Sequence, residues 1–239
     1  MHPAKVDCET IRTDHLIAQP VNSASSLGYS AAGLYVIATC GGPRPDDPGR
    51  QLAGRALGAT LVAMGVGSVL FHGPGGPRSK WLHDVPILAY GNTMTAWNLY
   101  DSALLPGAGA VALATGSTAA QSVLLAVRPD AVNVQGALST GVMWASEAVM
   151  RLARRSGFPH VPTRPQRVQD AGLALILGSA VLQVLGRSGF PLCRPDSLLQ
   201  PHAVWHLGSA AALALHALAA TGPESGPSPR RSDHAGAVL

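Results

Sequence analysis

Seven stretches of the chain are apolar over the length that a helix needs to cross a lipid bilayer, which is about 20 residues. Only 13% of the 239 residues are charged, against about 25% in average soluble domains. Seven such stretches with so few charges between them disfavour a soluble fold. They run roughly over residues 23–41, 54–73, 82–100, 104–127, 131–152, 169–187 and 201–221. The sequence therefore predicts an all-α fold, an integral membrane bundle of seven transmembrane helices.

The segments outside these stretches define the domain organisation. Proline and arginine gather in the connections, as in residues 41–51 and 154–170. Residues 222–239 combine Pro, Gly, Ser and charge, a composition typical of disorder. We expect one membrane domain over residues 1–221 and a disordered tail over 222–239. Within the domain, small residues four apart, such as Gly54 and Gly58, favour close helix packing in lipid.

Charge and cysteine content narrow the environment of the protein. The net charge of +4 comes from arginines in the connections. The sequence has no basic stripe with interleaved aromatic residues, so we do not expect nucleic acid as a partner. The first 20 residues have no apolar centre, so we expect no cleavable signal peptide. The three cysteines, Cys8, Cys40 and Cys193, are odd in number and lack metal-type spacing, which argues against a disulfide framework.

The distribution of basic residues predicts the orientation of a multi-pass membrane protein. With seven spans, the connections fall into two sets on opposite sides of the bilayer. Seven of the 17 Lys and Arg residues lie on the side of the N-terminus and ten on the other side. Because cytoplasmic loops carry the excess of positive charge, the count favours a cytoplasmic C-terminus.

Five polar residues interrupt the apolar stretches at related places. Ser68 and His72 lie four residues apart near the end of the second stretch, and Asp84 lies near the start of the third. His202 and His206 lie four apart at the start of the seventh. Consecutive spans alternate in direction, so all five residues belong to one side of the membrane at similar depth. Ionisable groups in membrane segments are costly, and they mark functional sites by default.

These residue types suit a metal-dependent hydrolysis. Residues four apart share one helix face, so His202 and His206 can bind one ion, with His72 as a third ligand. Three histidines with an open fourth position are the ligand set of a catalytic zinc site, where a bound water becomes acidic. Ser68 is suited to stabilise an oxyanion or orient the water. Asp84 is suited to take the proton of the water and pass it to the leaving amine.

Each of these residues also has a structural interpretation. Histidine caps, packs and hydrogen-bonds as well as binding metal, and a serine in a membrane helix usually bonds its own helix backbone. Asp84 can pair with Lys80 four residues before it. The coincidence of all five residues at one depth favours a shared site. Glu147, in the opposite half of the fifth stretch, is expected to pair with Arg151 four residues on.

At these residues the chain resembles the alkaline ceramidase family, part of the membrane hydrolase superfamily that includes the adiponectin receptors. The segments GVGSVLFH, HDVPI and QPHAVWHLG are similar to its three motif blocks, and the resemblance extends over residues 6–221. It implies a seven-helix zinc amidase in which zinc is bound by three histidines and the site is completed by two further residues. The implied ligands are His72, His202 and His206, and the implied further residues are Ser68 and Asp84. The implied substrate is ceramide or a related N-acyl lipid, cleaved to a fatty acid and an amine.

The chain departs from the family pattern in two places. The family aspartate lies three residues before a proline, whereas Asp84 lies two before Pro86 and His83 occupies the expected position. His83 is therefore a rival for the acid–base role. The calcium-binding segment of the eukaryotic enzymes keeps Asp7 and Glu9 here, but its later acidic position is Gln19. The loss of oxygen ligands argues against calcium.

The sequence thus predicts an intramembrane zinc hydrolase acting on linear amide C–N bonds of lipids. Two other functions stay open. One is a receptor-like or signalling protein of the same fold with a structural zinc. The other is a proton-coupled transporter that uses the Ser, His and Asp groups as a relay. Transporter sites are expected near the bilayer midplane, so the position of the polar groups near one face disfavours the relay.

Overall fold

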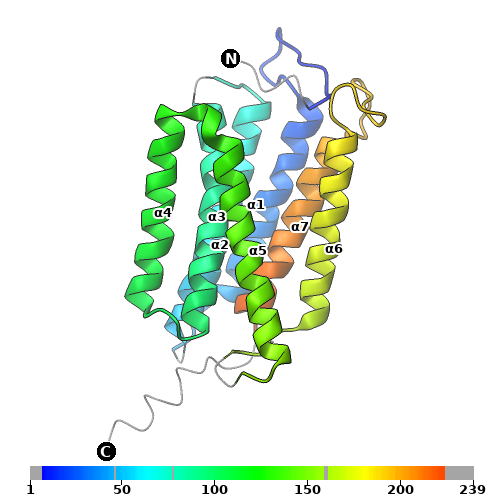
Figure 1. Ribbon diagram of the computed structural model, residues 1–239. Coiled ribbons are helices and arrows are strands. Elements are labelled where there is room, and N and C mark those ends of the chain that lie inside the picture. The colour runs from blue at the N-terminus through cyan, green and yellow to red at the C-terminus, as the bar shows by residue number, and fades with distance from the viewer. Residues whose placement is uncertain (1–6, 46, 77, 159–160, 224–239) are drawn as a thin grey trace, which may run out of the picture.

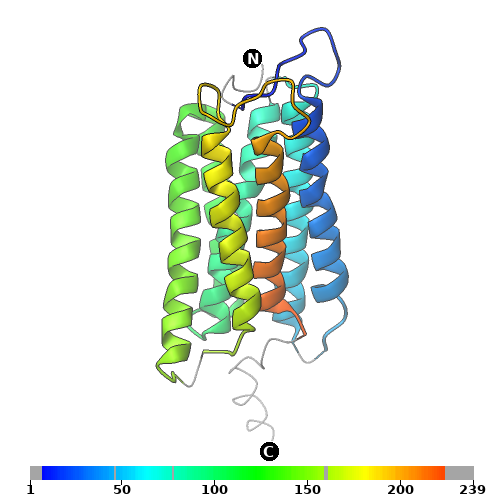
Figure 2. The same ribbon diagram turned by 90° about the vertical axis from the view of Figure 1, so that its right-hand side faces the viewer.

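The computed structural model describes residues 7–45, 47–76, 78–158 and 161–223. These residues form seven α-helices and one short 3-10 helix, and they contain no strand. The helices are α1 (Pro20–Cys40), α2 (Pro48–His72), α3 (Ser79–Asp101), α4 (Gly107–Val127), η1 (Pro129–Ala131), α5 (Val132–Arg155), α6 (Gln166–Leu185) and α7 (Pro201–Thr221). The α-helices run up and down as one bundle (Figures 1 and 2). The predicted all-α fold is confirmed, and the tail that we expect to be disordered lies from residue 224 outside the described residues.

Four of the helices, α2, α4, α6 and α7, are long and apolar enough to cross a membrane. Large apolar side chains lie exposed on their outer faces, including Val66, Val123, Leu177 and Leu207. Exposed apolar surface of this extent is costly in water, because burial of apolar area drives folding. The length and composition of these four helices and the exposed apolar surface are consistent with a membrane protein.

Close approach between helices depends on small residues, as the sequence pattern predicts. A Cβ atom on Gly58 of α2 would lie 2.7 Å from the carbonyl oxygen of Gly33 on α1. A Cβ atom on Gly67 would lie 2.0 Å from the carbonyl oxygen of Leu82 on α3. Both positions therefore require glycine for the observed packing. Gly67 allows the first turns of α3, which carry His83 and Asp84, to lie directly against the end of α2.

A buried ionic network closes the end of the bundle opposite the predicted site. Arg164, from the α5–α6 connection, donates through Nη1 to Glu147 Oε1 at 2.8 Å and through Nη2 to Asp101 Oδ2 at 3.0 Å. The predicted pairing of Glu147 with Arg151 is wrong, because Arg151 instead pairs with Asp170 of α6. The long connection folds back into the bundle and brings Arg164 to the carboxylate, a partner that helical spacing cannot reveal.

Two loops, residues 7–19 and 186–200, cover the end of the bundle where the histidines lie. They meet above the helix ends (Figures 1 and 2). A disulfide joins Cys8 to Cys193 there, with a Cα–Cα distance of 5.5 Å, while Cys40 is a buried free thiol. The expectation of no disulfide is therefore wrong. An odd cysteine count says nothing about a pair 185 residues apart that the bundle brings together.

Candidate metal centre

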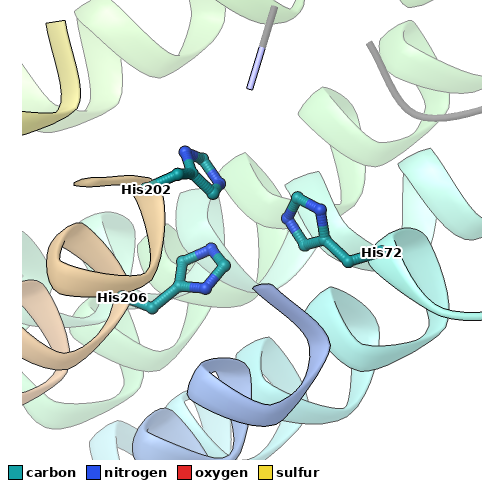
Figure 3. A group of neighbouring side chains, drawn as sticks. All are labelled: His72, His202 and His206. Carbon is teal, nitrogen blue, oxygen red and sulfur yellow. The ribbon is translucent and has the colours of Figure 1, made fainter. Parts of the chain in front are cut away.

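Three histidines from two helices converge at the end of the bundle that the loops cover. His72 comes from the last turn of α2, and His202 and His206 come from the first two turns of α7 (Figure 3). One ring nitrogen from each lies within 4.8 Å of the others. His72 and His206 are 1% exposed, and the side chain of His202 is 11% exposed. The proximity predicted by counting spans is thus observed for all three histidines, and the cluster could hold a metal ion.

The hydrogen bond of His72 fixes the form of its ring. His72 Nδ1 lies 2.7 Å from Gln19 Oε1, and the amide of Gln19 is oriented because its Nε2 donates to the Glu9 carbonyl at 3.1 Å. An amide oxygen only accepts, so Nδ1 of His72 carries the proton. The lone pair of the neutral ring is then on Nε2, which is the form that binds a metal.

His206 is held in the same way by hydroxyl groups of α1. Its Nδ1 lies 2.9 Å from Ser25 Oγ and 3.3 Å from Ser26 Oγ. Both hydroxyls donate their hydrogen to the carbonyl oxygen of Asn22, at 3.0 and 2.7 Å, so they are left to accept from the ring. His202 completes the set, because its Nδ1 faces Asp7 Oδ1 at 3.6 Å.

The three Nε2 atoms are the evidence that the site fits a metal. Each is buried and has no hydrogen-bond partner among the described residues. Buried polar atoms without partners are rare and costly, and here three acceptor lone pairs from separate residues share one small space. Histidine ligands of metals characteristically give their other N–H to a carboxylate, carbonyl or similar acceptor. A neutral imidazole set of this kind suits zinc and other borderline metals.

Ser68 and Asp84 lie at this end of the bundle with partners of their own. Ser68 is 1% exposed, and its hydroxyl lies 2.7 Å from that of Ser26. Because Ser26 gives its hydrogen to Asn22, Ser68 is the donor of this pair. Ser68 is therefore connected to His206 through one intervening hydroxyl.

Asp84 has both carboxylate oxygens engaged at the start of α3. Oδ1 lies 2.8 Å from His83 Nδ1, and Oδ2 accepts from Lys80. The imidazole of His83 packs against the cluster, with its centroid 6.1 Å from that of His72 and 4.9 Å from that of Phe71. The side chain of His83 is 21% exposed. His83 is thus the group whose ring borders that of His72, and Asp84 bonds to its Nδ1.

Several residues of the site escaped sequence reasoning. Gln19, Ser25 and Ser26 contact the histidines, yet amide and hydroxyl groups at a helix start carry no motif. Glu9 accepts from the backbone N–H groups of Val21 and Asn22 at 2.8 and 2.9 Å, and so it caps α1. A usable signal was present, since these residues precede or begin the first span on the side where the histidines were placed.

The end of the bundle therefore holds a three-histidine cluster with a His–Asp pair beside it. Such a set can bind one metal ion and hold or move one proton next to it. The function has to be inferred from these residues and from the sequence motifs. Comparison of the chain with protein-family models, with curated proteins and with solved structures finds no match.

Proposed function

We propose that this protein is an intramembrane zinc-dependent hydrolase that cleaves the amide bond of ceramide or a related N-acyl lipid. The observation that carries the proposal is the cluster of three imidazoles, each with a buried Nε2 that has no partner among the described residues. Nδ1 of His72 and of His206 has a hydrogen-bond acceptor, and Nδ1 of His202 faces Asp7 at 3.6 Å. The order and spacing of the three motif blocks, similar to those of alkaline ceramidases, support the choice of amide hydrolysis. The apolar outer surface of the bundle supports a substrate that arrives from the lipid phase.

Each residue of the proposed site has its own role in the hydrolysis. His72, His202 and His206 would hold the ion, which when bound would supply a Lewis acid and an acidic water at neutral pH. His83, with its Nδ1–H on Asp84, presents an unprotonated Nε2 that accepts the proton of the attacking water and returns it to the leaving nitrogen. Asp84 keeps that ring in the required form. Ser68 donates to the Ser26 hydroxyl, which also accepts from His206, so it supports a metal ligand. With substrate bound, the same hydroxyl would be suited to donate to the developing oxyanion.

We further propose that all seven helices cross the membrane, with the metal centre on the exoplasmic side and the C-terminus in the cytoplasm. The arginine distribution supports this orientation, and the Cys8–Cys193 disulfide supports it independently, because disulfides persist in oxidising compartments. A protease added to intact cells should spare a tag fused after Leu239 and reach one placed before Met1. The reverse pattern would overturn the orientation.

The hydrolysis proposal is tested by comparing His83 with Asp84. In purified protein, turnover of a fluorescent N-acyl lipid should fall by about 10²- to 10⁴-fold in His83→Ala, the range for loss of a general acid–base. Turnover should also fall in Asp84→Ala. The double variant should turn over the lipid no more slowly than His83→Ala does, because the effects of residues that act as a unit are not additive. His15→Ala, an exposed histidine of the N-terminal loop, serves as the matched control.

Two outcomes would count against this account. Full activity in His83→Ala with loss in Asp84→Ala would make Asp84 the direct acid–base. A wild-type protein that binds zinc yet hydrolyses no lipid in an untargeted screen would favour a receptor-like role with a structural zinc.

A further inference from the structure

The N-terminal loop, residues 7–19, is in contact with the histidine cluster and not merely with the helix ends. We call this segment the strap. Its last residue bonds to His72, its first faces His202, and it leads into α1, whose second turn bonds to His206. We propose that the strap is part of the metal centre, that Gln19 and Asp7 are positioning residues for the ligands, and that the Cys8–Cys193 disulfide holds Asp7 in place. This inference rests on the proposed metal centre.

Gln19 hydrogen-bonds to His72 through both its side chain and its backbone. The side chain accepts from the ring at 2.7 Å, and the backbone N–H donates to the carbonyl oxygen of His72 at 2.9 Å. The neighbouring Ala18 N–H donates to the Gly73 carbonyl at 3.1 Å. Gln19 is 1% exposed, so water does not compete for its amide. The end of the strap therefore sets both the rotation of the His72 ring and the position of its backbone.

Glu9 connects the strap to the helix that orients His206. Its carboxylate caps α1 through Val21 and Asn22, and its carbonyl oxygen accepts from the Gln19 amide at 3.1 Å. Asn22 is also the residue whose carbonyl oxygen takes the hydrogens of Ser25 and Ser26. One short segment of chain thus determines the hydrogen bonding of both buried histidines.

Asp7 is held against His202 by its neighbour in the sequence. Cys8 is tied to Cys193, and Thr10 bonds to the same loop through its N–H to the Pro195 carbonyl at 3.1 Å and through its hydroxyl to Asp196 at 2.9 Å. Cys8 has φ 63°, a left-handed conformation that non-glycine residues keep only where the surroundings enforce it. Without the disulfide, only the two Thr10 hydrogen bonds would hold this turn against the loop, and we expect Asp7 to leave His202.

The strap should therefore affect how tightly the metal is held. Partners of this kind orient a ligand ring and raise its basicity, and their loss typically costs 10- to 100-fold in metal affinity. Gln19 should matter for His72, and Asp7 for His202. Because the disulfide acts through Asp7, removal of both cysteines should reproduce the loss of Asp7 and add little to it.

The experiment measures zinc affinity of the purified full chain by competition with a chromogenic chelator, together with the visible spectrum of the Co²⁺-loaded protein. Gln19→Ala and Asp7→Ala should each bind zinc about 10- to 100-fold more weakly and alter the Co²⁺ bands.

The Cys8→Ser, Cys193→Ser variant should bind zinc as weakly as Asp7→Ala does. The triple variant should bind zinc no more weakly than either of these. Gln19→Glu keeps an acceptor for His72 but loses the donor to the Glu9 carbonyl, so it should weaken zinc binding less than Gln19→Ala does. Asp14→Ala, an exposed carboxylate of the same strap, should also behave as wild type.

Wild-type zinc affinity in both Gln19→Ala and Asp7→Ala would overturn the inference. So would equal weakening in Gln19→Glu and Gln19→Ala with lowered melting temperatures of the metal-free proteins, since that pattern describes a structural role. A wild-type protein that binds no zinc would end this inference and the metal centre together. Tight zinc binding without lipid hydrolysis would end only the enzymatic proposal, because affinity and Co²⁺ spectra do not depend on turnover.

Discussion

Replacing His202 and His206 together by alanine is expected to reduce the bound zinc from about one ion per chain to none. The double variant leaves a single imidazole, His72, at a centre that needs three protein ligands and a fourth open position. One neutral nitrogen cannot compete with water and buffer for the ion, so affinity is lost rather than lowered. Elemental analysis of the purified protein after dialysis measures the effect directly.

The control for this experiment is His216→Ala on the same helix. His216 lies deeper in α7, where its ring packs against Trp144 at 4.5 Å between centroids, and it is not one of the three clustered histidines. Its loss removes a buried histidine of α7 without touching the centre, and zinc content should stay at the wild-type level. If the His202→Ala, His206→Ala variant and the wild type contain the same amount of zinc per chain, the assignment of these ligands is wrong.

The histidine cluster was predictable because it depends on two regular quantities. Each helix crosses the bundle once, so the end of α2 and the start of α7 lie on one side. Helical spacing places His202 and His206 on one face. Neither step requires knowledge of loops or side-chain contacts. The same reasoning brings the start of α3 to the site, but it cannot decide whether His83 or Asp84 borders the cluster, because that depends on how α3 is rotated.

The strap and the ionic network were not predictable for a shared physical reason. Residues 7–19 and the α5–α6 connection are irregular segments, and no periodic pattern specifies their path. The sequence pattern suggests that Gln19 replaces an acidic calcium ligand, whereas the structure gives it His72 as a partner. Helical spacing predicts Arg151 as the partner of Glu147, because it reports only neighbours on the same helix. The actual partner, Arg164, comes from the connection 17 residues further along the chain.

Arg164→Ala is expected to destabilise the protein by about 3–5 kcal/mol, the cost of breaking a buried pair by removing one partner. The guanidinium is 1% exposed and bonds two carboxylates, Glu147 and Asp101, that are themselves 7% and 1% exposed at their side chains. Asn98 and Gln169 still donate to Glu147 at 2.9 and 3.1 Å, but neither carries a charge. The variant therefore leaves two buried anions whose main compensating cation is gone.

Unfolding of the purified protein in detergent, followed by denaturant titration of its helical circular dichroism, measures this loss. Arg167→Ala is the matched control, since Arg167 is an exposed arginine three residues on and exposed substitutions usually change stability by less than about 0.5 kcal/mol. A free energy of unfolding in Arg164→Ala within that range of wild type would contradict the network as a stabilising element.

Neutralising all three charged residues of this network together should destabilise the protein less than removing Arg164 alone. Adding Glu147→Gln and Asp101→Asn to Arg164→Ala should recover part of the lost stability, because the penalty comes from unpaired buried charge and not from the missing contact alone. Glu147→Gln and Asp101→Asn without the arginine change should be destabilising, because they leave the guanidinium buried without its counter-ions. Opposite signs for the same two substitutions in the two backgrounds would establish that Arg164, Glu147 and Asp101 act as one electrostatic unit at the closed end of the bundle.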